Sequence, residues 1–320
     1  MNSISGFAMP AKWMVAIITS VLVAGTAPGS DFLTENPQVT VDVSRTDGRL
    51  LMALDGDIWL LDAHGGEARR LIESNENLSF PKWSPDSKSV LYIGEFGDGT
   101  ALRVRELGGA ENRPLGNTDF DKQDASWHPN GERVVNSTDQ HHHGIDIWEN
   151  HLPTGLSWRL TSSLSDELSP AWSSNGKHLA WIMREGYHYS IMLRLYGEPE
   201  TSLLHSTVSL SSLTWRPDGS LLTYLRHGND ETTLEMAILS NPVLVRTMIE
   251  GEKFIASPVA WRDRFRLLYT ADGRIRSRDF EDRVSRPIHF RAMARSLAMP
   301  PPPTEIPQRE LTADTPPERH

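Results

Sequence analysis

The sequence predicts an all-β protein, a six-bladed β-propeller of four-stranded antiparallel blades. Five tryptophans recur with gaps of 44, 45, 43 and 46 residues: Trp83, Trp127, Trp172, Trp215 and Trp261. Most are followed by a tight-turn cluster, such as Ser-Pro-Asp or Arg-Pro-Asp-Gly, and then by a short apolar run. Repeats of roughly 40–50 residues built from short strands and turns are typical of propeller blades.

Each repeat contains four predicted strands joined by turns. In the first repeat, residues 39–43 alternate between valine and polar residues, as expected of a half-buried strand. Residues 49–54 and 57–62 flank Asp55-Gly56, which is a two-residue hairpin signal. Residues 68–72 complete the unit. Five more units follow the same plan, so we expect a propeller over residues 38–290.

The repeated tryptophans are interpreted as wedges between blades and not as a platform for a ligand. Val43 occupies the equivalent position in the first repeat, 40 residues before Trp83. A single blade has two apolar faces that it cannot bury alone, so each blade must cover the next. The ring could close directly from blade six to blade one. It could instead use residues 31–38 as a strand, and residues 288–297 could add an edge strand.

The N-terminus resembles a secretory signal. Lys12 precedes 13 predominantly apolar residues, 13–25, and small residues follow. This stretch is shorter than the roughly 20 residues that a membrane-spanning helix needs, and it fits the apolar region of a signal peptide. We expect residues 1–29 to be a signal peptide and the mature chain to be periplasmic or secreted, without a transmembrane span. An uncleaved anchor or a buried N-terminal helix is the alternative.

Composition limits the classes of partner. The net charge is −10 and no basic run is present, which argues against a nucleic acid partner. The chain has no cysteine, so disulfides and cysteine-ligated metals are excluded. Residues 299–320 include four consecutive prolines and lack apolar periodicity, so we expect a proline-rich disordered tail.

The amino-acid sequence of the repeats resembles that of a known family. Residues 81–88, Pro-Lys-Trp-Ser-Pro-Asp-Ser-Lys, resemble the TolB-like (WD-like) propeller repeat, and the resemblance covers nearly all of residues 39–290. TolB proteins carry an additional N-terminal α/β domain. Here we expect that domain to be missing, because only residues 31–38 separate the predicted signal from the propeller. The resemblance implies a propeller fold.

The last repeat resembles a narrower group. Residues 267–275 and 286–290 look like the final blade of propellers fused to amidohydrolases. In that family a metal-dependent hydrolase barrel follows the propeller. Only 30 residues follow Phe290 here. The resemblance therefore implies the propeller half without the barrel, its metal ligands or its activity.

One histidine cluster has metal-like spacing. His141 and His143 form an H-x-H pair, and imidazoles suit zinc, copper or nickel. The pair falls between two predicted strands of the third repeat, so we interpret it as a polar surface hairpin, with weak metal binding as the alternative. Acidic residues recur in the turns, including Asp47, Asp86, Asp218 and Asp272. We interpret these as turn formers, and a channel cation is the alternative.

No catalytic constellation is evident. The chain has no G-x-S-x-G elbow and no phosphate-binding loop, so neither a catalytic residue nor a cofactor is assigned. We therefore predict an exported, non-catalytic propeller that binds a protein or peptide in the cell envelope. The alternative is an accessory or truncated propeller half of a metal-dependent amidohydrolase supplied by another chain. A small ligand in the central channel is a third possibility.

Overall fold

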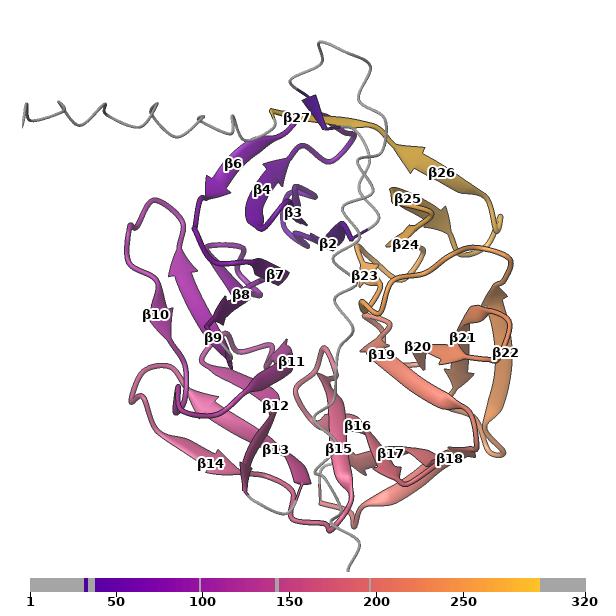
Figure 1. Cartoon of the computed structure of the whole chain (residues 1–320). Helices are drawn as coiled ribbons and strands as arrows, with labels where there is room; N and C mark the ends of the chain where they lie inside the picture. Colours follow the sequence, from indigo (N-terminus) through magenta and orange to yellow (C-terminus); the bar gives the residue numbers. More distant parts are fainter. Residues whose placement is uncertain (1–31, 34–37, 98, 142–143, 196, 294–320) are drawn as a thin grey trace, which may run out of the picture.

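In the computed structural model the described residues are 32–33, 38–97, 99–141, 144–195 and 197–293. Every regular element in these ranges is a β-strand. Twenty-four of these strands form six four-stranded antiparallel sheets around a central axis, and the other three form a three-stranded sheet (Figure 1). The predicted fold class is therefore confirmed. The predicted signal peptide and proline-rich tail lie outside the described residues. Within the described ranges, no helix is long and apolar enough to cross a membrane.

Each blade runs from an inner strand A to an outer strand D, and the same letters are used for all blades. The innermost strands A are β2 (Thr40–Val43), β7 (Leu78–Trp83), β11 (Lys122–Trp127), β15 (Asp166–Trp172), β19 (Ser209–Trp215) and β23 (Ala260–Trp261). The strands B are β3 (Leu50–Leu54), β8 (Ser89–Phe96), β12 (Arg133–His141), β16 (His178–Glu185), β20 (Leu221–His227) and β24 (Arg266–Ala271).

The outer half of each blade contains strands C and D. The strands C are β4 (Asp57–Leu61), β9 (Gly99–Glu106), β13 (Gly144–His151), β17 (His188–Leu195), β21 (Thr232–Ile238) and β25 (Arg274–Asp279). The peripheral strands D are β6 (Arg69–Ile72), β10 (Arg113–Pro114), β14 (Ser157–Arg159), β18 (Thr201–Ser206), β22 (Leu244–Ile249) and β26 (Ser285–Ile288). The A–B and C–D turns consequently lie on one face of the ring, here called the turn face. The B–C hairpins lie on the other face, here called the hairpin face.

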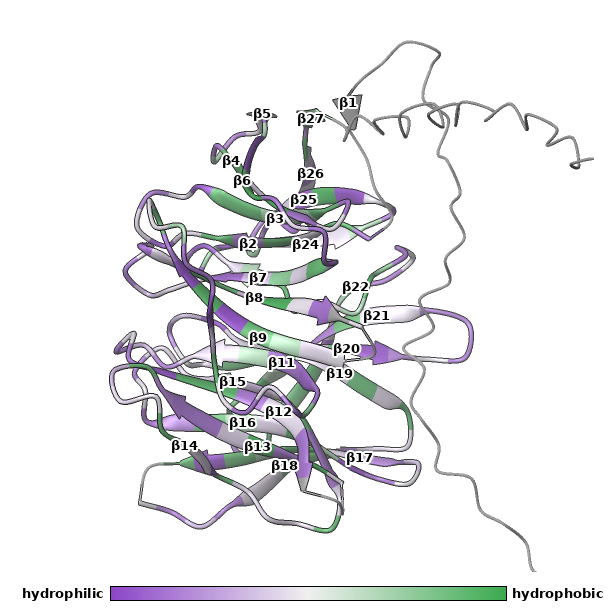
Figure 2. Ribbon diagram, turned by 60° about the vertical axis from the view of Figure 1, so that its left-hand side comes forward, coloured by the Kyte–Doolittle hydropathy of each residue, from purple (hydrophilic) through white to green (hydrophobic). Residues whose placement is uncertain are grey.

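The core is a set of apolar layers between adjacent blades. Figure 2 shows hydrophobic residues concentrated along the strands, with hydrophilic residues mainly in loops. Strand B of the first blade is buried along its whole length, and so is strand C, because blades cover both faces of these strands. This double burial explains why residues 50–54 are uniformly apolar instead of alternating.

Ring closure uses both chain ends. The first and last blades are each complete with four strands of their own, so closure from blade six to blade one is direct. In addition, β27 (Phe290–Met293) pairs in parallel with β5 (Gly66–Glu67) of the first blade. On its other edge β27 pairs with β1 (Phe32–Leu33). The closure hypotheses were thus not exclusive, since direct closure and strands from both flanking segments occur together.

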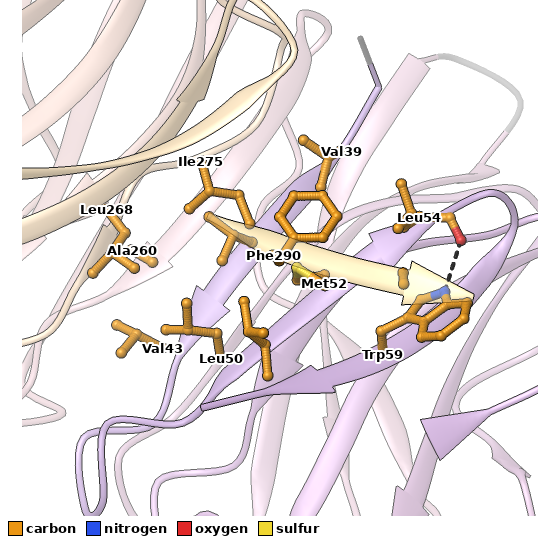
Figure 3. Close-up of a cluster of buried hydrophobic side chains, with 13 residues drawn as sticks. Val39, Val43, Leu50, Met52, Leu54, Trp59, Ala260, Leu268, Ile275 and Phe290 are labelled. Atoms are coloured by element: carbon orange, nitrogen blue, oxygen red, sulfur yellow. Dashed lines mark hydrogen bonds between the residues drawn. The ribbon is translucent and has the colours of Figure 1, made fainter. Parts of the chain in front are cut away.

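The seam between the sixth and first blades contains a buried apolar cluster (Figure 3). Phe290 and Ala292 project from β27 into this cluster, where Phe290 lies beside Val39, Ile275 and Met52. Trp59 donates from Nε1 to the carbonyl oxygen of Leu54 at 3.0 Å. Because residues from three separate parts of the chain meet here, the closing strand joins the two ends of the ring through hydrophobic burial.

Candidate functional site

The strongest candidate site is the turn-face end of the central channel. A cavity of about 330 Å³ lies there, and inner strands or A–B turns from all six blades line it. Its walls include the five repeat tryptophans, the turn prolines Pro85 and Pro129, and the polar residues Asp42, Lys82 and Asp124. Concave sites with a few convergent polar groups are the usual places for ligand recognition.

A repeated backbone irregularity shapes this channel. The residue three positions before the tryptophan has a positive φ in four blades: Phe80 at 48°, Asp124 at 36°, Ser169 at 52° and Ser212 at 61°. Each coincides with a register shift between strands A and B. Such bulges redirect side chains and are common beside functional sites. A positive φ is energetically unfavourable for residues other than glycine. Because it recurs at the same position in four blades, it is a regular part of the channel structure.

Hydrogen bonds join these inner strands from blade to blade. The Asp124 carboxylate accepts from the backbone N–H and the hydroxyl of Ser169, both at 3.1 Å. The Ser169 hydroxyl in turn accepts from the backbone N–H of Ser212 at 3.3 Å. Asp124 retains some exposure to the channel but is enclosed by protein, and this desolvation raises its pKa against the opposing hydrogen bonds from Ser169. The network crosses three blades and fixes their inner strands relative to one another.

Two cationic side chains reach the same space. Lys82 Nζ lies 3.9 Å from an Asp42 carboxylate oxygen. Arg45 follows the first inner strand, and its guanidinium donates to the hydroxyl of Ser174 at 3.3 Å. Ser174 belongs to the fourth blade, which stands opposite the first in a six-bladed ring. The Arg45 side chain therefore extends across the mouth of the channel.

The repeat tryptophans lie at the seams between blades. Trp83 donates from Nε1 to the Arg49 carbonyl oxygen at 3.2 Å, and Trp215 donates to the Ala171 carbonyl oxygen at 3.0 Å. Both acceptors belong to the preceding blade. Trp261 Nε1 lies 3.4 Å from Thr223 Oγ1, also in the preceding blade. The Nε1 atoms of Trp127 and Trp172 are buried and have no hydrogen-bond partner among the described residues.

His141 is not among the residues that line the channel cavity. His141 ends β12 at the B–C hairpin of the third blade, on the hairpin face, and His143 lies outside the described residues. No group of three or more histidine, aspartate and glutamate residues with metal-binding geometry occurs in the described part of the chain. Metal binding by His141 and His143 stays an untested prediction.

The acidic turn residues act locally. The carboxylates of Asp47, Asp86 and Asp218 each accept from the backbone N–H two residues further along, at 3.1 Å in all three turns. The hydrogen bond from the Ser84 hydroxyl, together with the backbone N–H of Lys88, lowers the pKa of Asp86. The interpretation as turn formers is confirmed for these three residues. The Asp272 carboxylate instead accepts from the backbone N–H of Lys253 at 3.2 Å and from the Arg276 guanidinium at 3.1 Å.

A serine–histidine pair occurs in the fifth blade. Ser211 Oγ lies 2.7 Å from His227 Nε2, and burial lowers the pKa of His227. The second ring nitrogen faces the hydroxyl of Thr232 at 3.2 Å, where a catalytic triad would place a carboxylate. Both residues lie on paired strands and not on an exposed elbow. The arrangement therefore gives no positive indication of a serine nucleophile.

Sequence reasoning missed the channel residues. Asp42 and Lys82 directly precede Val43 and Trp83, and the bulge residues stand three positions before the tryptophans. If the six repeats had been aligned on the tryptophan position, Asp42 and Lys82 would have appeared as equivalent residues, and so would the bulge residues. Such an alignment would not have revealed the positive φ, because phenylalanine, aspartate and serine give no local signal for it.

Comparison with curated proteins finds one distant relative. No protein-family profile matches the chain. The uncharacterized peptidase YuxL of Bacillus subtilis is 28% identical over 142 residues, which are 42% of this chain and 20% of that protein. The chain thus matches about a fifth of the length of this relative.

Solved structures share the fold at low identity. A putative TolB from Agrobacterium tumefaciens has a TM-score of 0.61 at 15% identity, over 72% of this chain and 86% of that chain. TolB from Acinetobacter baumannii has a TM-score of 0.64 at 14% identity, over 78% and 63% of the two chains. A chain of a nidogen–laminin complex has a TM-score of 0.60 at 13% identity, over 76% and 97%.

Enzymes also contain this architecture. An oligogalacturonate lyase in complex with manganese has a TM-score of 0.54 at 15% identity, over 78% of each chain. A prolyl endopeptidase has a TM-score of 0.55 at 13% identity, over 80% of this chain and 50% of that chain. Identities this low establish shared architecture, and shared architecture does not imply shared function. The chain is therefore a six-bladed β-propeller that shares its fold with the solved TolB structures.

Proposed function

We propose that this chain is an exported, non-catalytic scaffold of the cell envelope that binds a protein or peptide at the turn-face mouth of its channel. The observation that carries the proposal is the convergence of all six blades, four of them with A–B turns, around a cavity of about 330 Å³. Turns held by a rigid ring form a preorganised surface, and this preorganisation lowers the entropic cost of binding.

The chemistry of the mouth suits a polar polypeptide. Arg45 and Lys82 supply cations, Asp42 and Asp124 supply carboxyl groups, and the turn prolines and tryptophans supply apolar surface. Such a mixture can recognise backbone carbonyl and N–H groups as well as side chains of either charge. A propeller chain of similar fold occurs in the nidogen–laminin complex, which is consistent with protein binding by this architecture.

A second candidate is an accessory role beside a hydrolase. Two comparisons favour it. The chain matches one-fifth of a protein named as a peptidase, and its structure matches about half of a prolyl endopeptidase chain. Under this hypothesis the propeller docks or gates a catalytic domain on another chain. The proposed amidohydrolase partner is one form of it.

Affinity capture of the full chain from its native envelope extract, followed by mass spectrometry, tests both candidates. We expect one stoichiometric envelope protein to be retained by the wild type and by Arg246→Glu, which changes an exposed arginine on the outer strand β22. Arg45→Glu should abolish retention, because it reverses a charge in the channel mouth. Equal retention by both variants would refute the channel site, and retention of a hydrolase would select the second candidate.

A further inference from the structure

A crevice runs outward from the channel between the second and third blades. Its volume is about 530 Å³, and its walls come from the A–B and C–D turns and the adjoining strand ends of these two blades. Four residues line both this crevice and the channel cavity: Ser84, Pro85, Trp127 and Pro129. The two spaces therefore adjoin, and together they form a groove from the central axis toward the rim of the turn face.

The hydrogen bonds between inner strands differ from seam to seam. At two other seams, the side chain of the residue before the tryptophan position accepts from the backbone N–H of the next tryptophan: Asp42 from Trp83 at 2.7 Å, and Ser126 from Trp172 at 3.2 Å. At the seam between the second and third blades this position is Lys82, whose ammonium has no acceptor atom. Trp127 Nε1 also has no hydrogen-bond partner among the described residues.

The opposite end of the same seam is closed. On the hairpin face, the backbone N–H of Thr100 donates to the Asp121 carboxylate at 2.8 Å, and the Thr100 hydroxyl donates to the Lys122 carbonyl oxygen at 2.8 Å. The second and third blades are thus joined at one face and separated at the other. The crevice therefore results from the arrangement of the two blades and not from the conformation of a single loop.

The crevice lining combines an apolar floor with an acidic rim. The apolar part of the lining consists of Pro85, Pro129, Pro153, Trp127, Val104 and Leu152. Three carboxylates line the same space, those of Asp86, Glu106 and Glu132, against the single cation of Arg113. The Arg113 guanidinium donates to the Leu152 carbonyl oxygen at 3.2 Å. The side chains of Asp86, Glu106 and Glu132 are all exposed.

We infer that this crevice is the outer half of a peptide-binding groove that takes an extended, basic segment of a partner protein. A proline or aliphatic side chain of the segment packs over Trp127, and its arginine or lysine side chains pair with Glu106 and Glu132. Extended proline-containing segments commonly dock in aromatic-lined grooves. The inference rests on the proposed function and specifies the chemistry of the partner.

Charge complementarity distinguishes a partner from the tail of this chain. Residues 299–320 contain proline runs that could fit an aromatic groove, but they carry four acidic residues and two arginines. An acidic segment is repelled by an acidic rim, whereas a basic one is attracted. The rim carboxylates therefore favour a basic segment from another chain.

A positional-scanning library of fluorescein-labelled octapeptides tests this inference on the full chain by fluorescence anisotropy. We expect arginine and lysine to be selected at adjacent positions toward one end, with proline or an aliphatic residue at the centre. The double variant Glu106→Gln, Glu132→Gln should weaken the selected peptides about fivefold and remove the basic preference, because rim ion pairs are worth little individually. The affinity of the wild type should fall as salt concentration rises.

The matched control is Glu198→Gln, Glu250→Gln, which removes two exposed carboxylates outside the crevice and should leave affinity unchanged. If no library peptide binds, the proposed function fails together with this inference. If peptides bind and Arg45→Glu weakens them while the crevice variant does not, the proposed function stands and the crevice assignment is overturned. Tighter binding after deletion of residues 299–320 would assign the crevice to the tail and overturn the assignment to a partner.

Discussion

Two seams of the ring differ in how completely they are packed. Between the sixth and first blades, Phe290 and Ala292 of the closing strand belong to a buried apolar cluster, and a crevice of about 250 Å³ opens on the turn face. Between the second and third blades, the indole N–H of Trp127 has no partner among the described residues, and a crevice of about 530 Å³ opens on the turn face. A closed ring needs adjacent blades to stay in contact at every seam, but the packing at a seam does not have to be complete.

The difference follows from what each seam must do. The closing seam joins two ends of the chain, so its stability depends on apolar burial between residues that are remote in sequence. The second and third blades are already joined by a covalent connection and by the Thr100 hydrogen bonds on the hairpin face. That seam can therefore remain open on the turn face without breaking the ring.

The largest expected effect is at the closing seam. Phe290 is 4% exposed, and replacement by alanine should lower the free energy of unfolding by about 3–5 kcal/mol, through lost burial and a residual cavity. The corresponding fall in Tm is on the order of 10 °C for a propeller of this size. Differential scanning calorimetry measures it. Phe265→Ala, at a site that is 42% exposed, should change Tm by far less, and equal effects would show that the closing cluster is not a main stabiliser.

A smaller effect should separate two equivalent tryptophans. Trp215→Phe removes a buried hydrogen bond to the Ala171 carbonyl oxygen, whereas Trp127→Phe removes an N–H without a partner. Both changes delete a similar volume, so Trp215→Phe should be more destabilising by about 1–2 kcal/mol. Chemical denaturation of the two variants gives the difference. Equal losses of stability would mean that Trp127 also makes a favourable polar contact at its seam.

The smallest expected effect concerns pH. Burial raises the pKa of Asp124 above the value of about 3.9 for an unfolded aspartate. The folded state therefore binds this proton more tightly, so the group's contribution to stability falls as pH rises from about 4 through the raised pKa. Asp124→Asn should remove this loss, and its Tm relative to the wild type should rise over that interval.

The pKa of the turn residue Asp86 is shifted in the opposite direction from that of Asp124. Its pKa is lowered, chiefly by the hydrogen bond from Ser84, so its contribution is present above about pH 4 and is lost as pH falls through the lowered pKa. Asp86→Asn should therefore become relatively more destabilising as pH rises toward neutrality. Thermal denaturation between pH 3 and 7 compares the two variants. A difference between Asp124→Asn and the wild type that did not vary with pH would contradict the raised pKa.

Most strands and turns of the blades could be predicted, because short sequence motifs specify them locally. Asp55-Gly56 marks the first B–C hairpin, and the structure places β3 and β4 on either side of it. Strands B in the second to fourth blades extend further than their apolar runs indicate. Strand β8, for example, reaches Phe96, because the polar hairpin continues the ladder beyond the buried residues. Hydrophobic alternation detects burial, whereas strand length depends on hydrogen bonds that continue into solvent.

The sequence by itself determined the number of blades, their order and the turns between them. Each of these depends on residues close together in the chain, such as a tryptophan and the proline–aspartate turn after it. Tertiary structure alone decided how wide each seam is, which side chains meet in the channel and how the ring is closed. The contacts of Asp124 with Ser169, of Arg45 with Ser174 and of β27 with β5 join residues 45, 129 and more than 220 positions apart. No local pattern specifies such contacts, because they exist only after the blades have assembled around a common axis.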